Sequence, residues 1–267
     1  MKFFLVVLIL IYTLFPFYWA VVSSLRSGTS LFSASLVPIS CAFQNYTSIF
    51  VEQSFGRNLL NSVVVAFASV LLSQAVGLLA AYSLSRVAFR GRKFLLYSFL
   101  SVSMFPQIAV LSGLFELIRA LGLYNTWTGL TLAYMVFTLP FTVWILTTFM
   151  KEIPRGIEEA AVMDGIGPLK ILWYIFLPIM APSIVTAGLL AFIAAWNEFL
   201  FSLTLTLSDK ARTVPVAIAL MGGSSQHELP WGRIMAASVT VTLPVVALAL
   251  VFQKWIVSGL TAGSVKG

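Results

Sequence analysis

The sequence predicts an all-α membrane protein with six transmembrane helices. Of its 267 residues, 60% are hydrophobic and only 9% are charged, whereas soluble globular chains have about 45–50% apolar and about 25% charged residues. The apolar residues also form six long runs, and a run of about 20 such residues can cross a bilayer as a helix. The excess apolar surface must therefore face lipid.

The six runs place the predicted spans at 3–22, 59–84, 94–117, 127–150, 184–207 and 234–257. A loop at 151–183 and a tail at 258–267 complete one expected transmembrane domain, 1–267. Prolines inside four of the runs are interpreted as kinks, because neighbouring helices can satisfy the freed backbone carbonyls. The polar segment 23–58 is expected to form a small extracytoplasmic cap with little regular structure.

The first run has an alternative interpretation as a secretory signal peptide, because Lys2 precedes an apolar stretch. However, the run continues through Phe17, Tyr18 and Trp19 without a clear small-residue cleavage site. We therefore expect a retained helix.

The distribution of Lys and Arg predicts that both termini face the cytoplasm, because basic residues are enriched in cytoplasmic loops. With the N-terminus inside, ten of the 16 Lys and Arg residues fall on the cytoplasmic side: Lys2, Arg86, Arg90, Arg92, Lys93, Lys151, Arg155, Lys170, Lys254 and Lys266. The net charge of +7 is accordingly interpreted as a topology signal, and no nucleic-acid partner is expected.

Other functional classes find little support in the composition. Single Cys and His residues, Cys41 and His227, exclude an internal disulfide and disfavour a Cys/His metal cluster. The sequence has no phosphate-binding G-x-x-x-x-G-K-[ST] loop and no catalytic constellation. A secondary transporter is the remaining alternative, but no inverted repeat is evident and only Glu198 is placed to carry a proton.

The loop 151–183 predicts two short helices joined by a turn. Pro154 can begin the first helix, and Gly165 stands where a helix end requires a residue with positive φ. Gly167 and Pro168 then allow a second helix to begin. A connector lying on the membrane surface is the alternative. The cluster Glu158, Glu159 and Asp164 disfavours it, because inner-leaflet surfaces attract basic residues.

This loop resembles the EAA loop of ABC importer permeases, whose pattern is E-A-A, three residues, G, nine residues, I, one residue and L-P. Every fixed position is matched, by Glu159, Ala160, Ala161, Gly165, Ile175, Leu177 and Pro178. Three further stretches are similar to the maltose- and trehalose-type members: the W-N-E-F segment 196–199, the outer-loop sequences 214–218 and 223–226, and the ending 259–267. The resemblance therefore covers nearly the whole chain.

The resemblance implies the fold of a type I ABC importer permease, with cytoplasmic coupling helices and a location in the bacterial or archaeal inner membrane. It implies four kinds of partner: a second permease in a heterodimer, two ATP-binding subunits, an extracytoplasmic sugar-binding protein and membrane lipid. ATP and Mg would be bound by the ATPase, so this chain would be no enzyme and would hold no cofactor. The implied cargo is a disaccharide such as trehalose or maltose, with an oligosaccharide or glycerol phosphate as the alternative.

The resemblance also implies roles for individual residues. Coupling to the ATPase falls to Glu158, Glu159, Ala160, Ala161, Asp164 and Gly165, and the tail residues Ser264 and Lys266 are expected to touch the ATPase. Candidates for the translocation path are Trp196, Asn197 and Glu198. A charge in the membrane usually faces a cavity or a partner helix, so ordering the subunit interface remains an equal alternative for Glu198.

Overall fold

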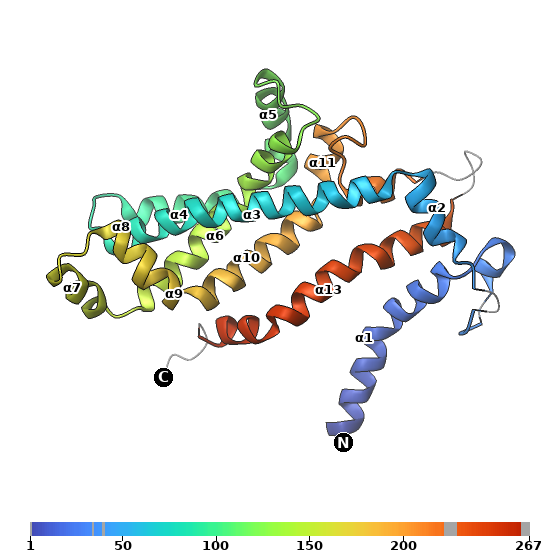
Figure 1. The fold of residues 1–267 in the computed structure, drawn as a ribbon, viewed down its shortest axis with the longest axis horizontal. Helices are drawn as coiled ribbons and strands as arrows, with labels where there is room; N and C mark the ends of the chain where they lie inside the picture. Colours follow the sequence, from blue (N-terminus) through green and yellow to red (C-terminus); the bar gives the residue numbers. More distant parts are fainter. Residues whose placement is uncertain (1, 34, 39–40, 222–228, 263–267) are drawn as a thin grey trace. The chain divides into compact units, whose positions relative to one another are not determined.

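The computed structural model describes residues 2–33, 35–38, 41–221 and 229–262, and within these ranges all regular structure is helical. Contacts within the chain group it into two compact units. The first comprises Met1–Asn61 and Ser208–Ala247, and the second comprises Ser62–Leu207 and Leu248–Gly267. The prediction of an all-α fold is confirmed. Figure 1 shows the helices, coloured along the sequence.

Four helices are each long and apolar enough to cross a membrane: α1 (Lys2–Ser24), α3 (Phe55–Arg86), α6 (Trp127–Glu152) and α13 (Trp231–Ala262). Two further spans are possible as bent helix pairs. One joins α4 (Arg92–Ser103) to α5 (Gln107–Ala120) with a 96° bend, and the other joins Pro168–Ile179 to α10 (Ala181–Trp196) with an 80° bend. The described residues thus contain four continuous candidate spans, and up to six spans if each bent pair is counted as one.

The third predicted span differs from the expected continuous helix, because it is broken at residues 104–106. Pro106 has no backbone N–H to continue the helix, and its ring disfavours a helical conformation at Phe105. Pro106 instead adopts an extended conformation directly before α5. A proline interpreted from the sequence as a kink is therefore a break of 96°.

The first unit contains a helix where the sequence suggested an irregular cap. A short 3₁₀ helix, η1 (Gly28–Phe32), precedes α2 (Gln44–Glu52), and α12 (Val214–Ala219) comes from the segment before the last predicted span. Ile49 of α2 is fully buried in a cluster with Phe55 and Val214. The buried Arg26 guanidinium donates to the Ser33 and Ser35 carbonyls and lies over the Trp19 ring. Long-range contacts, which local patterning does not reveal, order this segment.

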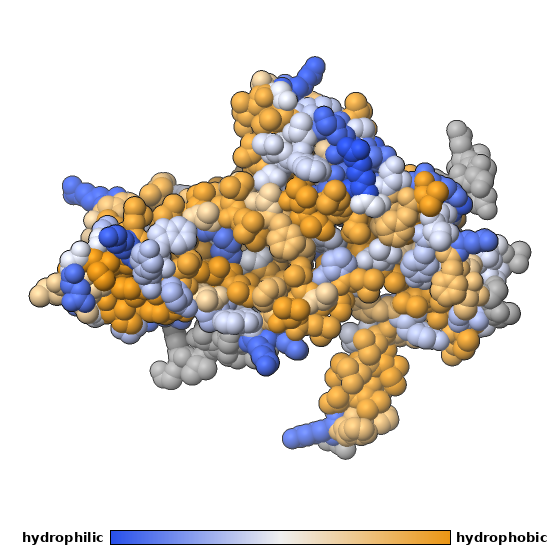
Figure 2. Space-filling model, in the orientation of Figure 1, coloured by the Kyte–Doolittle hydropathy of each residue, from blue (hydrophilic) through white to orange (hydrophobic). Residues whose placement is uncertain are grey.

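Apolar side chains cover α1 on all its sides. Phe3, Ile11 and Tyr12 are more than 60% exposed, and Figure 2 shows apolar atoms over the visible length of this helix. A helix that is hydrophobic all round requires apolar surroundings. This exposure supports a membrane location for α1.

In the second unit, α3 packs closely against α6 and α10 (Figure 1). The Ser73 hydroxyl lies 2.8 Å from the Thr138 hydroxyl of α6, and the Gln74 amide donates to the Ile184 carbonyl of α10 at 2.8 Å. Small residues allow these approaches, since a Cβ on Gly77 would lie 2.9 Å from the Thr142 methyl group. Small residues and interhelical polar contacts are typical of membrane helix packing.

The α3–α6 approach predicts that Gly77→Ala destabilises the protein. Overpacking of a tight contact costs about 1–3 kcal/mol, which outweighs the gain of about 0.5–1 kcal/mol from replacing a helical glycine by alanine. Gly113→Ala in α5 is the matched control, because a Cβ on Gly113 would have no heavy atom within 4 Å. We expect a lower midpoint of thermal unfolding in detergent for Gly77→Ala only. Equal midpoints for the two variants would contradict the close approach.

Candidate coupling site and translocation path

The first motif helix, α7 (Arg155–Met163), ends in a Schellman motif. The Ile166 amide donates to the Ala161 carbonyl at 3.0 Å, and the Gly165 amide donates to the Val162 carbonyl at 2.9 Å. Gly165 has a φ of 75°, as the sequence predicted for the residue that ends this helix. This conformation and the two backbone bonds define the direction in which the chain leaves α7.

The two faces of α7 divide the predicted coupling residues. Glu159, Ala160, Asp164 and Gly165 are exposed, whereas Ala161 is 4% exposed. Glu158 also points inward, where its carboxylate accepts a hydrogen bond from Tyr82 and lies 3.7 Å from the Arg86 Nε atom. The adjacent acids therefore have different surroundings: Glu158 faces its own chain and Glu159 faces outward.

The second part of the loop is one continuous run of three helical segments. It comprises α8 (Pro168–Ile171), the π-helical turn η2 (Leu172–Phe176) and α9 (Leu177–Ile179). Ile171, Leu172 and Phe176 are buried in one cluster with Leu78 of α3 and Leu146 of α6. Together α7, α8, η2 and α9, residues 155–179, are called the coupling element below. It is packed on the spans and is not a loose connector.

The predicted path residues lie at a break in the fifth predicted span, because α10 ends at Trp196 and α11 (Leu200–Leu205) begins three residues after Asn197. Trp196 is buried and its ring stacks on Phe192, whereas Asn197 is exposed. Glu198 is 5% exposed. The structure thus brings the three residues together, but only Asn197 has an exposed side chain.

The Glu198 carboxylate caps the first turn of α11. Its two oxygens accept hydrogen bonds from the Phe201 and Ser202 amides, at 2.7 and 3.0 Å. A carboxylate satisfies the free amides of a helix start and interacts favourably with the helix dipole. Neither of the two roles considered from the sequence included this contact within the chain.

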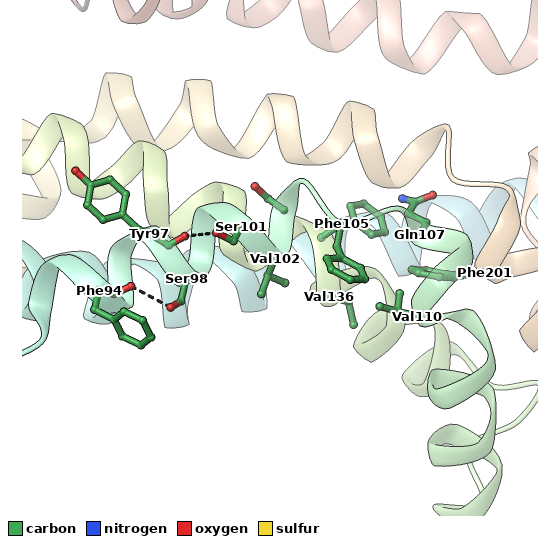
Figure 3. A pocket seen from close by; sticks show the side chains of 12 residues that line it. Phe94, Tyr97, Ser98, Ser101, Val102, Phe105, Gln107, Val110, Val136 and Phe201 are labelled. Carbon is green, nitrogen blue, oxygen red and sulfur yellow. Dashed lines mark hydrogen bonds between the residues drawn. The ribbon is translucent and has the colours of Figure 1, made fainter.

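A cavity of about 600 Å³ lies at the bend between α4 and α5. Figure 3 shows its aromatic and aliphatic lining, which includes Phe94, Tyr97 and Phe201. The hydroxyls of Ser98 and Ser101 donate to carbonyls of their own helix, at 3.0 and 2.9 Å. The described lining of this cavity is therefore mostly apolar.

Sequence reasoning missed Tyr82 and Arg86, which contact the coupling element from the C-terminal end of α3. Arg86 was interpreted only as a topology signal. One signal in the sequence could have found them. Tyr82 and Arg86 are four residues apart on an expected helix, which puts both side chains on one face. The tail residues Ser264 and Lys266 lie outside the described residues, as do the outer-loop sequence 223–226 and His227. Among the residues described, no group of His, Cys, Asp and Glu could hold a metal ion.

In the part of the chain that the structure describes, four continuous apolar helices of spanning length and two bent helix pairs indicate a multi-pass membrane protein. Residues 73–262 match the family described as binding-protein-dependent transport system inner membrane component. The chain belongs to this family, whose members are the permease subunits of ABC importers.

Two relatives match nearly the whole chain. The trehalose/maltose transport system permease protein of Thermococcus litoralis is 43% identical over 263 residues, covering 98% of this chain and 94% of the relative. The trehalose transport system permease protein of Mycobacterium tuberculosis is 40% identical over 256 residues, covering 96% and 93%. A solved bacterial ABC transporter involved in alginate import is 22% identical, with a TM-score of 0.81 over 95% of this chain and 94% of the other. It supports the fold alone.

The cap on α11 predicts that Glu198→Ala lowers stability. The substitution removes the carboxylate that accepts from the Phe201 and Ser202 amides, and losing one partner of a buried hydrogen bond costs about 1–3 kcal/mol. The control is Asn197→Ala, because the exposed Asn197 amide donates to the Ile193 carbonyl of its own helix. We expect a lower midpoint of thermal unfolding in detergent for Glu198→Ala than for Asn197→Ala. No difference between them would mean that the cap contributes nothing.

Proposed function

We propose that this chain is one of two different permease subunits of an ATP-driven importer that carries a sugar across the cytoplasmic membrane. The coupling element carries the proposal. It holds the complete EAA pattern, and α7 and the turn that follows it present a coupling face made of Glu159, Ala160, Asp164 and Gly165. The full-length similarity to sugar permeases supports the same conclusion.

In this proposal the coupling face inserts into a cleft of the ATPase. Glu159 forms an ion pair with a basic residue there, and the small side chain of Ala160 allows close approach. Val162 and Met163 are 58% and 88% exposed beside this face. Burial of apolar surface is the main favourable term in most protein–protein association, so these side chains strengthen the contact that Glu159 orients.

The remaining partners and the orientation are part of the same proposal. Two ATP-binding subunits bind ATP and Mg and act on the coupling elements of both permeases, while an extracytoplasmic binding protein delivers the sugar. The permease itself has no enzymatic activity. Both termini and the coupling element face the cytoplasm, which agrees with the basic loop 86–93. The tail residues Ser264 and Lys266 reach the ATPase as well.

The proposed cargo is a disaccharide of the trehalose or maltose type. This choice follows two relatives whose names specify those sugars. Other relatives are named for sulfoquinovosyl glycerol and for diacetylchitobiose, so other carbohydrates are the alternative. Within this chain, we place Asn197 on the path at the break in span five, with Trp196 and Glu198 supporting its position.

The reconstituted complex in liposomes tests this proposal. We expect detergent extraction to retain an ATP-hydrolysing partner and uptake of labelled trehalose or maltose to require ATP, with an oligosaccharide and glycerol phosphate as competing solutes. Sugar uptake by this chain alone in liposomes would contradict the ATP-driven importer. Binding of each sugar to the cognate receptor identifies the cargo.

Glu159→Lys is predicted to lower ATP-driven uptake by about tenfold or more, because it reverses the charge at the expected ion pair. The loss corresponds to at least about 1.4 kcal/mol. The control is Glu116→Lys in α5, an exposed acid to which no coupling role is given. Both variants should reach the membrane in normal amounts. Normal uptake by Glu159→Lys would contradict the role of Glu159.

Gly165→Pro is predicted to uncouple transport, because proline has a φ near −65° and cannot adopt the φ of 75° that turns the chain after α7. Gly165→Asn is the control. Asparagine tolerates the left-handed conformation, and nothing lies within 4 Å of a Cβ at this position. We expect uptake per membrane-inserted protein to be nearly normal for Gly165→Asn and lost for Gly165→Pro. Equal uptake by both would show that the turn is not required.

A further inference from the structure

The inner ends of α3 and α6 meet the coupling element at a buried arginine. The Arg86 side chain is only 4% exposed. One guanidinium nitrogen, Nη2, donates to the Met150 carbonyl at 2.6 Å and to the Ile153 carbonyl at 2.7 Å. These carbonyls belong to the C-terminal end of α6, where a positive charge also interacts favourably with the helix dipole. Arg86 therefore fastens α3 to the end of α6.

The same side chain reaches the coupling element on two sides. Its Nε atom lies 3.7 Å from the Glu158 carboxylate, within ion-pair range but too far for a direct hydrogen bond. The guanidinium also lies over the Phe176 ring of η2, 5.0 Å from its centroid, a cation–π geometry. One arginine thus joins α3, α6, α7 and η2.

Tyr82 adds a second bond from α3 to the same carboxylate. Its hydroxyl donates to the other Glu158 oxygen at 2.9 Å, and its ring lies 5.8 Å from the Phe176 ring. Tyr82 and Arg86 are one turn apart, so they face the same side of α3. Glu158 is thus held by two side chains of one helix.

These contacts surround the only covalent link from α6 to α7. Ile153 and Pro154 join the two helices in extended conformations, with ψ angles of 127° and 137°. A two-residue extended link is a place where backbone rotation can absorb a movement of α7. The bond from Arg86 to the Ile153 carbonyl fixes this link.

We propose that Tyr82, Arg86 and Glu158 form a latch that makes the coupling element and the inner ends of α3 and α6 move as one body. A force on α7 then reaches two spans directly as well as span five through α9. The latch rests on the proposed function, because it requires an ATPase that acts on α7. Glu158 is in this view a positioning residue within the permease, and Glu159 alone of the two acids contacts the ATPase.

The test uses the complete transporter in liposomes and measures sugar taken up per ATP hydrolysed. Because Arg86 is buried and its replacement risks misfolding, the variants are Tyr82→Phe, Glu158→Gln and their double mutant. Tyr82→Phe removes one hydroxyl, and Glu158→Gln removes the charge that faces Arg86. Tyr12→Phe on the exposed face of α1 is the control. We expect each single variant to lower uptake per ATP by about tenfold, which is about 1.4 kcal/mol, while ATPase association and hydrolysis continue.

The double mutant distinguishes the latch from independent effects. Residues that act through one contact give non-additive changes, so the double mutant should lose little more than either single variant. Normal uptake per ATP in both single variants overturns the latch. Loss of ATPase association by Glu158→Gln also overturns it, because that result places Glu158 on the docking surface. Failure of the unmodified chain to associate with an ATPase instead overturns the proposed function.

Discussion

The second unit depends on a constraint set by its solvent: a bilayer offers no water, so polar groups on its helices bond to their own backbone or to other helices. On α3, Ser73 bonds to α6, Gln74 to α10 and Tyr82 to α7. An interhelical hydrogen bond of this kind contributes on average only about 0.6 kcal/mol. Their effect is therefore mainly to fix the register of the helices, while Gly77 allows α3 and α6 to approach closely.

Much of the fold could be predicted from local sequence. The long apolar runs place α1, α3, α6 and α13 to within a few residues at most ends, and Gly165 gives the end of α7 its positive φ because few other residues tolerate it. Such features depend on neighbours in the chain or on the bilayer. The family assignment followed from the same local pattern.

Features that depend on distant residues, and breaks that lie inside apolar runs, could not be predicted. The inward orientation of Glu158 depends on its hydrogen bond from Tyr82, 76 residues earlier in the chain, and no spacing rule connects the two. The capping role of Glu198 was missed because the apolar run 184–207 concealed the break at 197–199. Likewise, a proline inside an apolar run is compatible with a kink or with a full break. Pro140 and Pro244 remain inside α6 and α13, while Pro106 separates two helices.

The bend of 80° between Pro168–Ile179 and α10 has a geometric consequence. The 16 residues of α10, at about 1.5 Å each, form an arm roughly 24 Å long. A rotation of about 10° about its N-terminal end would then displace its C-terminal end by roughly 4 Å. The break at Asn197 stands at that C-terminal end. In the proposed importer, α10 would therefore amplify a small rotation of the coupling element into a larger displacement beside Asn197.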